Sequence, residues 1–161
     1  MSLFCGIIKI KVVEAESLKA TDYSTRIFQN SFKGFCVSPY VSIDVDDVPI
    51  GRTQTKARTQ NPQFNEDFQS ELVHHTGRCI NFTVFHDSAL PPDEFVANCT
   101  LTLTQLKIGI INRLWLDLEP CGRLHLSIEL DGTFKEGKKK LDLLLDLEEK
   151  MRKIKILKVV F

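Results

Sequence analysis

Three adjacent residues, His86, Asp87 and Ser88, are of the types that make up a hydrolase triad. Triad members converge from separate elements of a fold, and consecutive residues cannot orient toward one another in that way. The sequence also lacks a glycine-rich phosphate loop and the His-Arg-Asp and Asp-Phe-Gly motifs of a kinase active site. We therefore predict no catalytic residue and no enzymatic activity for this chain.

The five cysteines, at positions 5, 36, 79, 99 and 121, are odd in number and form no Cys-x-x-Cys pair. This pattern argues against a disulfide framework or a zinc site and favours reduced, mostly buried thiols in an intracellular protein. Lys9 and Lys11 interrupt the first apolar stretch, so no signal peptide is predicted. No apolar run reaches the roughly 20 residues of a membrane span. We expect a cytoplasmic protein without a cofactor.

The charges of the chain balance, with 21 Lys or Arg against 21 Asp or Glu. A net charge of zero argues against a nucleic-acid partner. The balance is uneven along the chain, because residues 135–161 contain nine Lys or Arg and five Asp or Glu, a net of +4. Residues 1–134 therefore carry −4. Hydrophobic residues make up 43% of the 161 residues, which suits one domain with a real core.

Apolar and polar residues alternate in short segments, which is the pattern of half-buried strands. The predicted strands cover residues 8–12, 40–45, 48–55, 64–68, 79–85, 95–103, 114–118 and 123–130. Their spacing of about 8–12 residues predicts an all-β fold, an eight-stranded antiparallel β-sandwich. We further expect a bulge at Gly51, a short helical turn at 104–108, and Trp115 in the core rather than on a ligand-binding surface.

The last segment changes character. Residues 138–161 place Leu, Met and Ile mostly at three- and four-residue steps, which predicts a C-terminal helix. We therefore divide the chain into a sandwich domain, 1–134, and a charged helical tail or linker, 135–161. The apolar positions of the helix allow three arrangements: packing back on the domain, which we favour, pairing with another helix, or lying on a membrane.

The order of several short motifs carries a family resemblance. These are Ile8–Leu18, Ser38-Pro39-Tyr40-Val41, Asn61–Phe68, Val84–Asp87, Phe95–Cys99 and Trp115–Pro120. Together they resemble a C2 domain, and they closely resemble the C2 domain that opens novel protein kinase C of the epsilon and eta type. The resemblance covers roughly residues 3–134 and leaves the tail uncovered.

The resemblance implies where calcium ligands would stand in this chain. The five positions are occupied by Asp22, Ser38, His86, Ser88 and Glu94, with Asp93 as a neighbour of the last. Only Asp22 and Glu94 are carboxylates, whereas calcium needs six to eight oxygens, several of them from carboxylates. An imidazole at His86 suits calcium badly. We therefore predict no metal site and docking that is independent of calcium.

The resemblance also implies docking on anionic membranes that contain phosphatidic acid or phosphatidylserine. The loop residues Tyr23 and Leu90 match positions that insert into lipid in the family, and Arg26 and Ile27 lie in the same first loop. Arg52 and Lys56 match a strand region that holds lipid headgroups in calcium-binding relatives. The alternatives are loop side chains tucked against the sandwich and a basic strand face that is merely solvated.

The family also binds anchoring proteins of the activated kinase. The segment Glu14–Thr21 looks like the one implicated in that contact, and His86–Asp93 looks like a segment that mimics the partner and covers it. The predicted partner-binding residues are Glu14, Ser17, Leu18, Lys19, His86 and Asp87.

We thus expect a regulatory C2 domain of a novel-type protein kinase C, a serine/threonine kinase, that is recruited peripherally to membranes on activation. The alternative is a freestanding C2 protein-interaction module with no kinase attached, whose helical tail takes the partner.

Overall fold

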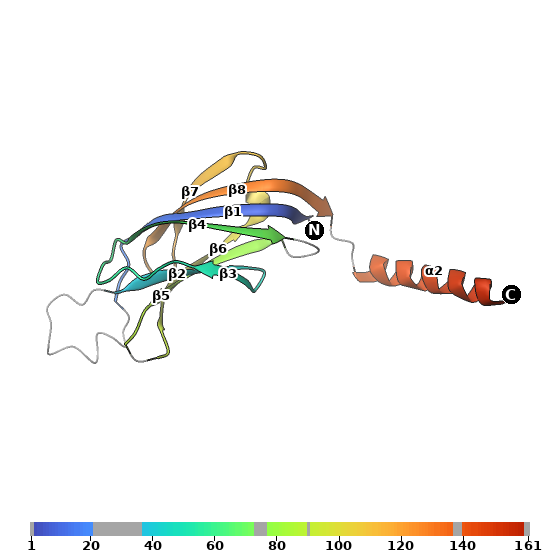
Figure 1. Ribbon diagram of the computed structural model, residues 1–161, viewed down its shortest axis with the longest axis horizontal. Coiled ribbons are helices and arrows are strands. Elements are labelled where there is room, and N and C mark those ends of the chain that lie inside the picture. The colour runs from blue at the N-terminus through green and yellow to red at the C-terminus, as the bar shows by residue number, and fades with distance from the viewer. Residues whose placement is uncertain (1, 21–36, 73–76, 90, 137–139, 160–161) are drawn as a thin grey trace.

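The computed structural model in Figure 1 describes residues 2–20, 37–72, 77–89, 91–136 and 140–159. The predicted lipid-binding residues Tyr23, Arg26, Ile27 and Leu90 lie outside these ranges, as does the predicted calcium-ligand position Asp22.

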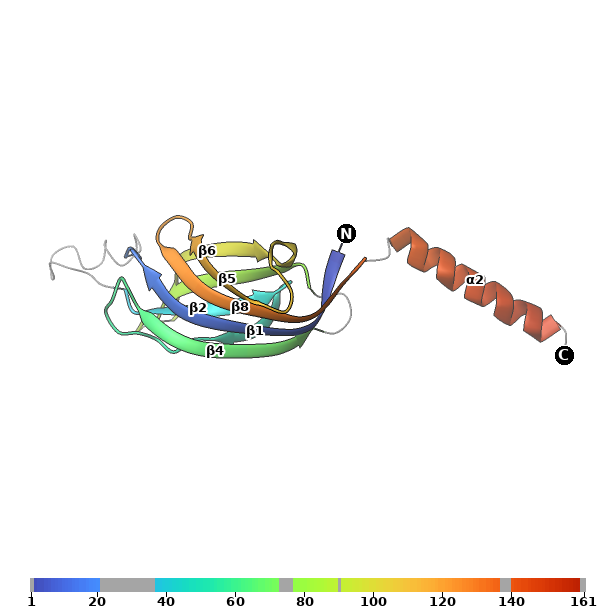
Figure 2. The same ribbon diagram turned by 90° about the horizontal axis from the view of Figure 1, so that it is seen from above.

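Eight antiparallel strands form two sheets of four, which confirms the predicted sandwich. The strands are β1 (Ser2–Glu16), β2 (Pro39–Val45), β3 (Val48–Arg52), β4 (Gln63–Leu72), β5 (Cys79–His86), β6 (Glu94–Thr102), β7 (Ile111–Asp117) and β8 (Arg123–Glu136). Sheet A has the order β4-β1-β8-β7, and sheet B has the order β3-β2-β5-β6. The two sheets lie face to face as curved layers (Figure 2).

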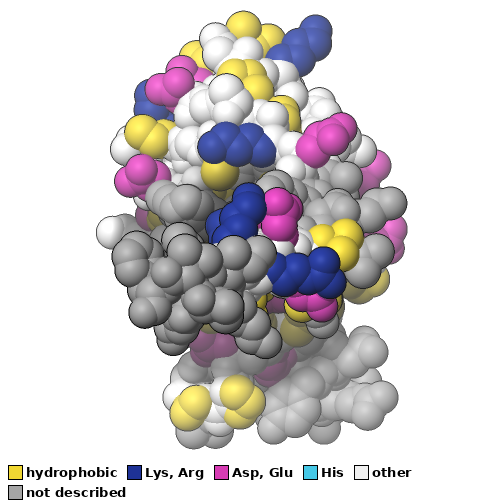
Figure 3. Space-filling view, turned by 90° about the vertical axis from the view of Figure 1, so that its right-hand side faces the viewer, with side chains coloured by type: hydrophobic (Ala, Val, Ile, Leu, Met, Phe, Trp, Pro, Cys, Tyr) yellow, Lys and Arg dark blue, Asp and Glu magenta, His cyan; other side chains and the backbone are white. Residues whose placement is uncertain are grey.

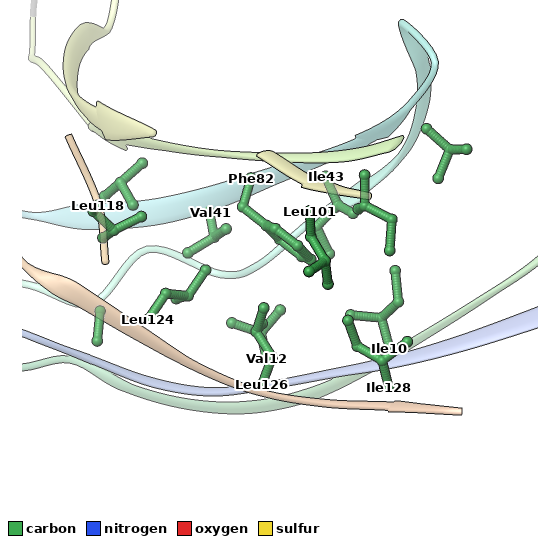
Figure 4. Packing of buried hydrophobic residues seen from close by; sticks show 14 of the residues in the cluster. Ile10, Val12, Val41, Ile43, Phe82, Leu101, Leu118, Leu124, Leu126 and Ile128 are labelled. Carbon is green, nitrogen blue, oxygen red and sulfur yellow. The ribbon is translucent and has the colours of Figure 1, made fainter. Parts of the chain in front are cut away.

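The core lies between the sheets and is built from the alternate residues of each strand. In sheet B, Val41, Ile43 and Phe82 are fully buried. They face Leu124 and Leu126 of sheet A across the interior (Figure 4). Because burial of apolar surface is the dominant favourable term in folding, this two-sided contact holds the sheets together and fixes which residues point outward.

The bulge at Gly51 is confirmed, and two other local features differ in extent from their prediction. The register of β2 with β3 shifts at Ile50, so that the extra residue of a bulge stands beside Gly51. The bulge brings Gly51 against the ring of Phe68, where an added Cβ would lie 2.8 Å from a ring carbon. A 3₁₀ helix, Leu103–Gln105, replaces the predicted turn at 104–108. The strand pair β1–β8 is longer than predicted and joins Ser2 to Glu136.

Trp115 does not lie in the core, contrary to our prediction. On β7 the inward positions are taken by Leu114 and Leu116, which pack against the core. The alternation of side chains along a strand then turns Trp115 outward, where it is 39% exposed.

The described cysteines Cys5, Cys79, Cys99 and Cys121 are free thiols and are partly buried. Burial raises the pKa of the Cys99 thiol to about 11, so this thiol is protonated near neutral pH.

The predicted C-terminal helix is α2 (Lys140–Val159). It lies beyond the end of the sandwich where β1 begins and β8 ends (Figures 1 and 2). Five apolar side chains on it are 50–59% exposed: Leu144, Leu145, Leu147, Met151 and Ile154. The favoured arrangement, in which the helix packs back on the domain, is therefore wrong for this structure.

The reason is the distribution of apolar residues around α2, which forms no single stripe. Glu149 and Lys153, four residues apart on the helix, form an ion pair with 3.1 Å between Oε1 and Nζ. On the side of the molecule from which the helix projects, basic and acidic side chains are interspersed rather than gathered by sign (Figure 3). No described helix is both long enough and apolar enough to cross a bilayer.

The inter-sheet core gives a prediction about stability. Phe82→Ala removes a fully buried ring and should lower the free energy of unfolding by about 3–5 kcal/mol. The matched control is Phe95→Ala on the neighbouring strand β6, where the ring is 49% exposed and the loss should stay below about 1 kcal/mol. Urea denaturation followed by circular dichroism measures both, and equal losses would contradict the described core.

Candidate docking site at the loop end

The candidate site is the loop end of the sandwich, where β1 ends, β2 begins, β5 ends and β6 begins. The chain leaves β1 through Ser17, which has a positive φ of 57° and whose backbone N–H donates to Asn61 Oδ1 at 2.9 Å. Leu18 follows and is fully buried in the core. The anchored Leu18 thus holds the start of the first long loop against the sandwich, with Ser17 and Lys19 exposed on either side.

Ser38 is the centre of one hydrogen-bond group at this end. Its backbone N–H donates to His86 Nδ1 at 2.9 Å, and its carbonyl accepts from the N–H of Asp87 at 2.9 Å. Its Oγ accepts from the N–H of Arg58 at 3.1 Å. Because His86 Nδ1 accepts a hydrogen bond, that nitrogen carries no proton in this arrangement.

The carboxylates of the loop that follows β5 are held by donors of the protein itself. Thr55 Oγ1 donates to Asp87 Oδ2 at 2.6 Å. Asp93 accepts from two donors, the hydroxyl of Tyr40 at 2.7 Å and the N–H of Ser88 at 3.1 Å. These bonds tie the beginning of β2, the segment after β3 and the loop before β6 into one network.

Tyr40 is the hub of this network. Its ring stacks on Phe85 at 5.6 Å between centroids, and the guanidinium carbon of Arg52 lies 4.0 Å from its ring centroid. Burial, followed by the hydrogen bond to Asp93, raises the pKa of Tyr40 to about 12. The same hydrogen bond, with that from Ser88, lowers the pKa of Asp93. Asp93 is therefore an ionised, hydrogen-bonded carboxylate at neutral pH.

The described residues at this end do not by themselves form a ligand set that fits a calcium ion. Of the described ligand positions, Ser38 and His86 use their Oγ and Nδ1 atoms as acceptors within the network. The nearby carboxylate of Asp93 is occupied by two protein donors. Within the described parts of the chain, no three His, Cys, Asp or Glu side chains are grouped so that they could hold a metal.

The two predicted partner-binding segments come from different sheets. Glu14 lies on sheet A, where its Oε1 is 3.4 Å from His125 Nδ1 of β8. His86 and Asp87 lie at the end of sheet B. Leu18 is removed from the predicted set because a fully buried side chain cannot contact a partner.

The two described members of the predicted lipid-binding set lie near the network. Arg52 is exposed and stacked over Tyr40. Lys56 is half-buried, and its backbone N–H donates to the carbonyl of Pro39 at 2.9 Å. Arg52 thus ends the edge strand β3 and Lys56 lies on the segment that follows it, both beside the loop end.

The sequence and the fold match a known family. The C2 domain profile matches residues 6–118, and the chain belongs to the C2 domain family. The chain is 43% identical over 131 residues to Protein kinase C-like 1B of Caenorhabditis elegans, a match that covers 81% of this chain and 18% of that protein. It is 38% identical over 142 residues to Protein kinase C epsilon type of Rattus norvegicus, covering 86% and 19%.

The eta type of Homo sapiens is 35% identical over 140 residues, covering 83% of this chain and 20% of that protein. The predicted likeness to novel-type protein kinase C is thus confirmed. The chain spans about a fifth of the length of these curated relatives.

Solved C2 domains share the fold at lower identity. A C2 domain of plant Extended Synaptotagmin 1 superimposes with a TM-score of 0.64 at 20% identity, covering 81% of this chain and 98% of that one. The paired C2 domains of Extended-Synaptotagmin 2, in a calcium-bound structure, give a TM-score of 0.65 at 22% identity, covering 81% and 47%.

Sequence reasoning missed two residues that organise this end. Tyr40 entered only as part of a motif, and Thr55 only as part of a predicted strand. Their roles depend on contacts with Asp93 and Asp87, which lie 53 and 32 positions away along the chain. The position of Tyr40 at the start of a strand, directly after Ser38-Pro39, was the available signal.

The Tyr40–Asp93 contact predicts a measurable pKa change. In a Tyr23→Phe background, which leaves Tyr40 as the single tyrosine, Asp93→Asn should lower the pKa of Tyr40 from about 12, because a negative charge beside the phenolate is removed. The pKa should stay above 10.0, since burial is the larger cause. Ultraviolet titration of the phenolate measures it, and an unchanged pKa would show that the contact is absent.

Proposed function

We propose that this chain is a calcium-independent C2 domain that docks on anionic membranes through its loop end. In the full protein it would be the regulatory region of a novel-type protein kinase C, a serine/threonine kinase. It would be cytoplasmic and recruited peripherally to membranes containing phosphatidic acid or phosphatidylserine on activation. The observation that carries this proposal is the network at the loop end, in which Asp93, Asp87 and His86 are engaged by protein donors.

The physical argument concerns what a metal does in such a domain. A calcium ion between acidic loops both ties the loops together and cancels their negative charge. Here the hydrogen bonds of Tyr40 and Thr55 tie the loops, and Arg52 supplies a cation next to Asp93. A basic residue near an anionic surface contributes about 1 kcal/mol, so an exposed Arg52 favours association without an ion.

The loop residues Tyr23, Leu90, Arg26 and Ile27 belong to the same proposal on the strength of the family resemblance. Tyr23 and Leu90 would insert between headgroups, and burial of one or two such side chains favours binding by about 2–5 kcal/mol before ordering costs. Such a contribution suits reversible recruitment. In this proposal, Tyr23 and Leu90 insert into the membrane, and Arg52 and Lys56 attract the anionic headgroups.

A second candidate function is docking on an anchoring protein. Ser17 and Lys19 favour it, because both are exposed and the backbone at Ser17 is fixed by Asn61. Asp87 is exposed at the end of the other sheet and is held by Thr55. A freestanding interaction module with no kinase attached would use the same residues. Absence of binding to every vesicle composition would favour this function over membrane docking.

Vesicle sedimentation tests the membrane proposal. The full chain should bind vesicles containing phosphatidic acid or phosphatidylserine equally well in calcium and in chelator, and should ignore vesicles of phosphatidylcholine alone. Arg52→Gln should weaken binding by about fivefold, the effect of about 1 kcal/mol. The matched control Arg78→Gln removes an exposed arginine just before β5, away from the loop end, and should have little effect.

Two results would count against the proposal. A clear gain in binding when calcium is added would show that the loop end holds the ion after all. Equal losses for the Arg52 and Arg78 variants would show a diffuse charge effect with no defined site.

A further inference from the structure

The outer face of sheet A carries a second group of side chains that the loop-end proposal does not use. At its edge, β7 presents Ile111, Arg113 and Trp115 to solvent, each two residues from the next. Their partners across β8 are Glu129, Ser127 and His125. These pairs form three rows across the sheet. We call them the apolar row, which begins at Ile111, the basic row, which begins at Arg113, and the aromatic row, which begins at Trp115.

In the aromatic row, contacts with neighbouring side chains fix the orientation of the Trp115 ring. The rings of Trp115 and His125 lie 4.6 Å apart and are tilted by only 10°. The guanidinium carbon of Arg123 lies 4.8 Å from the Trp115 ring centroid. Glu14 contacts the His125 ring, with 3.4 Å between Oε1 and Nδ1. Trp115 is thus a 39% exposed, oriented aromatic, the residue type most enriched at the energetic centres of protein interfaces.

The basic row borders a groove of about 390 Å³. Its lining includes Lys9, Lys11, Arg113, Ser127, Asp67 and Glu129. Glu129 pairs with Lys9 at 3.5 Å. In the described part of the chain, neither Lys11 nor Arg113 takes part in an ion pair or a side-chain hydrogen bond.

Ser127 stands between Lys11 and Arg113 in the strand register. Two long cationic side chains therefore flank one small polar residue in the groove. The row runs across the sheet as Asp67, Lys11, Ser127 and Arg113. Its one carboxylate, Asp67, lies on the edge strand β4 beyond Lys11, at the opposite end of the row from Arg113.

We propose that this groove binds an extended protein segment in which an acidic residue has an apolar residue two positions away on each side. Extended chains place side chains on one face about 6.6–6.8 Å apart at every second residue. That spacing equals the spacing of Ile111, Arg113 and Trp115. The acidic side chain would lie between Arg113 and Lys11 over Ser127, with its apolar neighbours on Ile111 and on Trp115.

The charge pattern selects this occupant. A membrane surface would meet Glu14, Asp117 and Glu129 on the same face, and these acidic residues oppose a uniformly anionic plane. A single carboxylate presented by a peptide can lie in the row of Arg113, Ser127 and Lys11, beside Glu129 rather than over it, whereas a membrane plane would meet all the acidic residues at once. The site lies on the sheet opposite to Arg52, so it is independent of the proposed membrane docking.

The test is selection of a displayed random decapeptide library on the full chain, followed by titration of the enriched synthetic peptides. The chain contains one tryptophan, Trp115, two residues beyond Arg113 on β7, so its fluorescence reports on the apolar contact that the proposed segment makes next to the groove. Enriched peptides should share the apolar-x-acidic-x-apolar pattern and should shift the Trp115 emission on binding. Arg113→Gln and Lys11→Gln should each weaken their affinity, the former by about tenfold or more, since hydrogen bonds to charged groups are strong. The matched control Arg78→Gln should leave the affinity unchanged.

Selection repeated on Arg113→Glu should lose the acidic residue from the enriched pattern. The proposal is overturned if no common pattern emerges, or if bound peptides leave Trp115 emission and the Arg113→Gln affinity unchanged. A shift of Trp115 emission caused by vesicles of phosphatidylserine would also overturn it, because the face would then contact lipid.

Discussion

The apolar contact between the two sheets is the constraint on which the rest of the molecule depends. Each strand gives its alternate residues to that contact, so its remaining residues are fixed on an outer face. With Val41 pointing inward, Tyr40 lies on the outer face of sheet B, covered by Arg52; with Leu114 and Leu116 pointing inward, Trp115 lies on the outer face of sheet A. A change of register by one residue in any strand would exchange these sets, which is why packing and recognition cannot be varied independently in this fold.

At the loop end a second, polar set of contacts acts where the apolar core stops. The segments that meet there come from distant parts of the chain and need cross-links to keep a defined shape. Tyr40 with Asp93, Thr55 with Asp87, and His86 with the backbone of Ser38 provide them. In the proposed function, these bonds take the structural role that an ion has in calcium-binding relatives, and they leave the loop end ready to dock in the absence of calcium.

The sequence predicted the fold well because alternation and turn residues are local signals. Strand positions, the bulge beside Gly51 and the C-terminal helix all rest on such signals. Errors arose where the outcome depended on which of two faces is buried. Trp115 is the largest apolar side chain of its strand, yet Leu114 and Leu116 pack against the core and leave it outside.

Burial and long-range pairing explain the remaining differences. The sequence predicts a partner contact for Leu18, but this residue completes the core, because apolarity alone does not distinguish a contact residue from a buried one. The apolar spacing of α2 predicts a helix that packs back on the domain, but its apolar residues are spread around the helix and form no single face. The network around Tyr40 could not be predicted because its bonds join residues far apart along the chain.

In the proposed function, the acceptor atoms of His86, Asp87 and Asp93 at the loop end accept hydrogen bonds from the protein and do not bind an ion. The most direct measurement is a ¹H–¹⁵N correlation spectrum of the isolated chain as calcium is added to about 1 mM, which saturates calcium-sensor sites. The amides of Ser38 and Ser88 donate to His86 Nδ1 and Asp93 Oδ1, so they report directly on those acceptors. We predict that both resonances stay in place. Saturable shifts of the two amides, with a common midpoint in calcium, would contradict the claim.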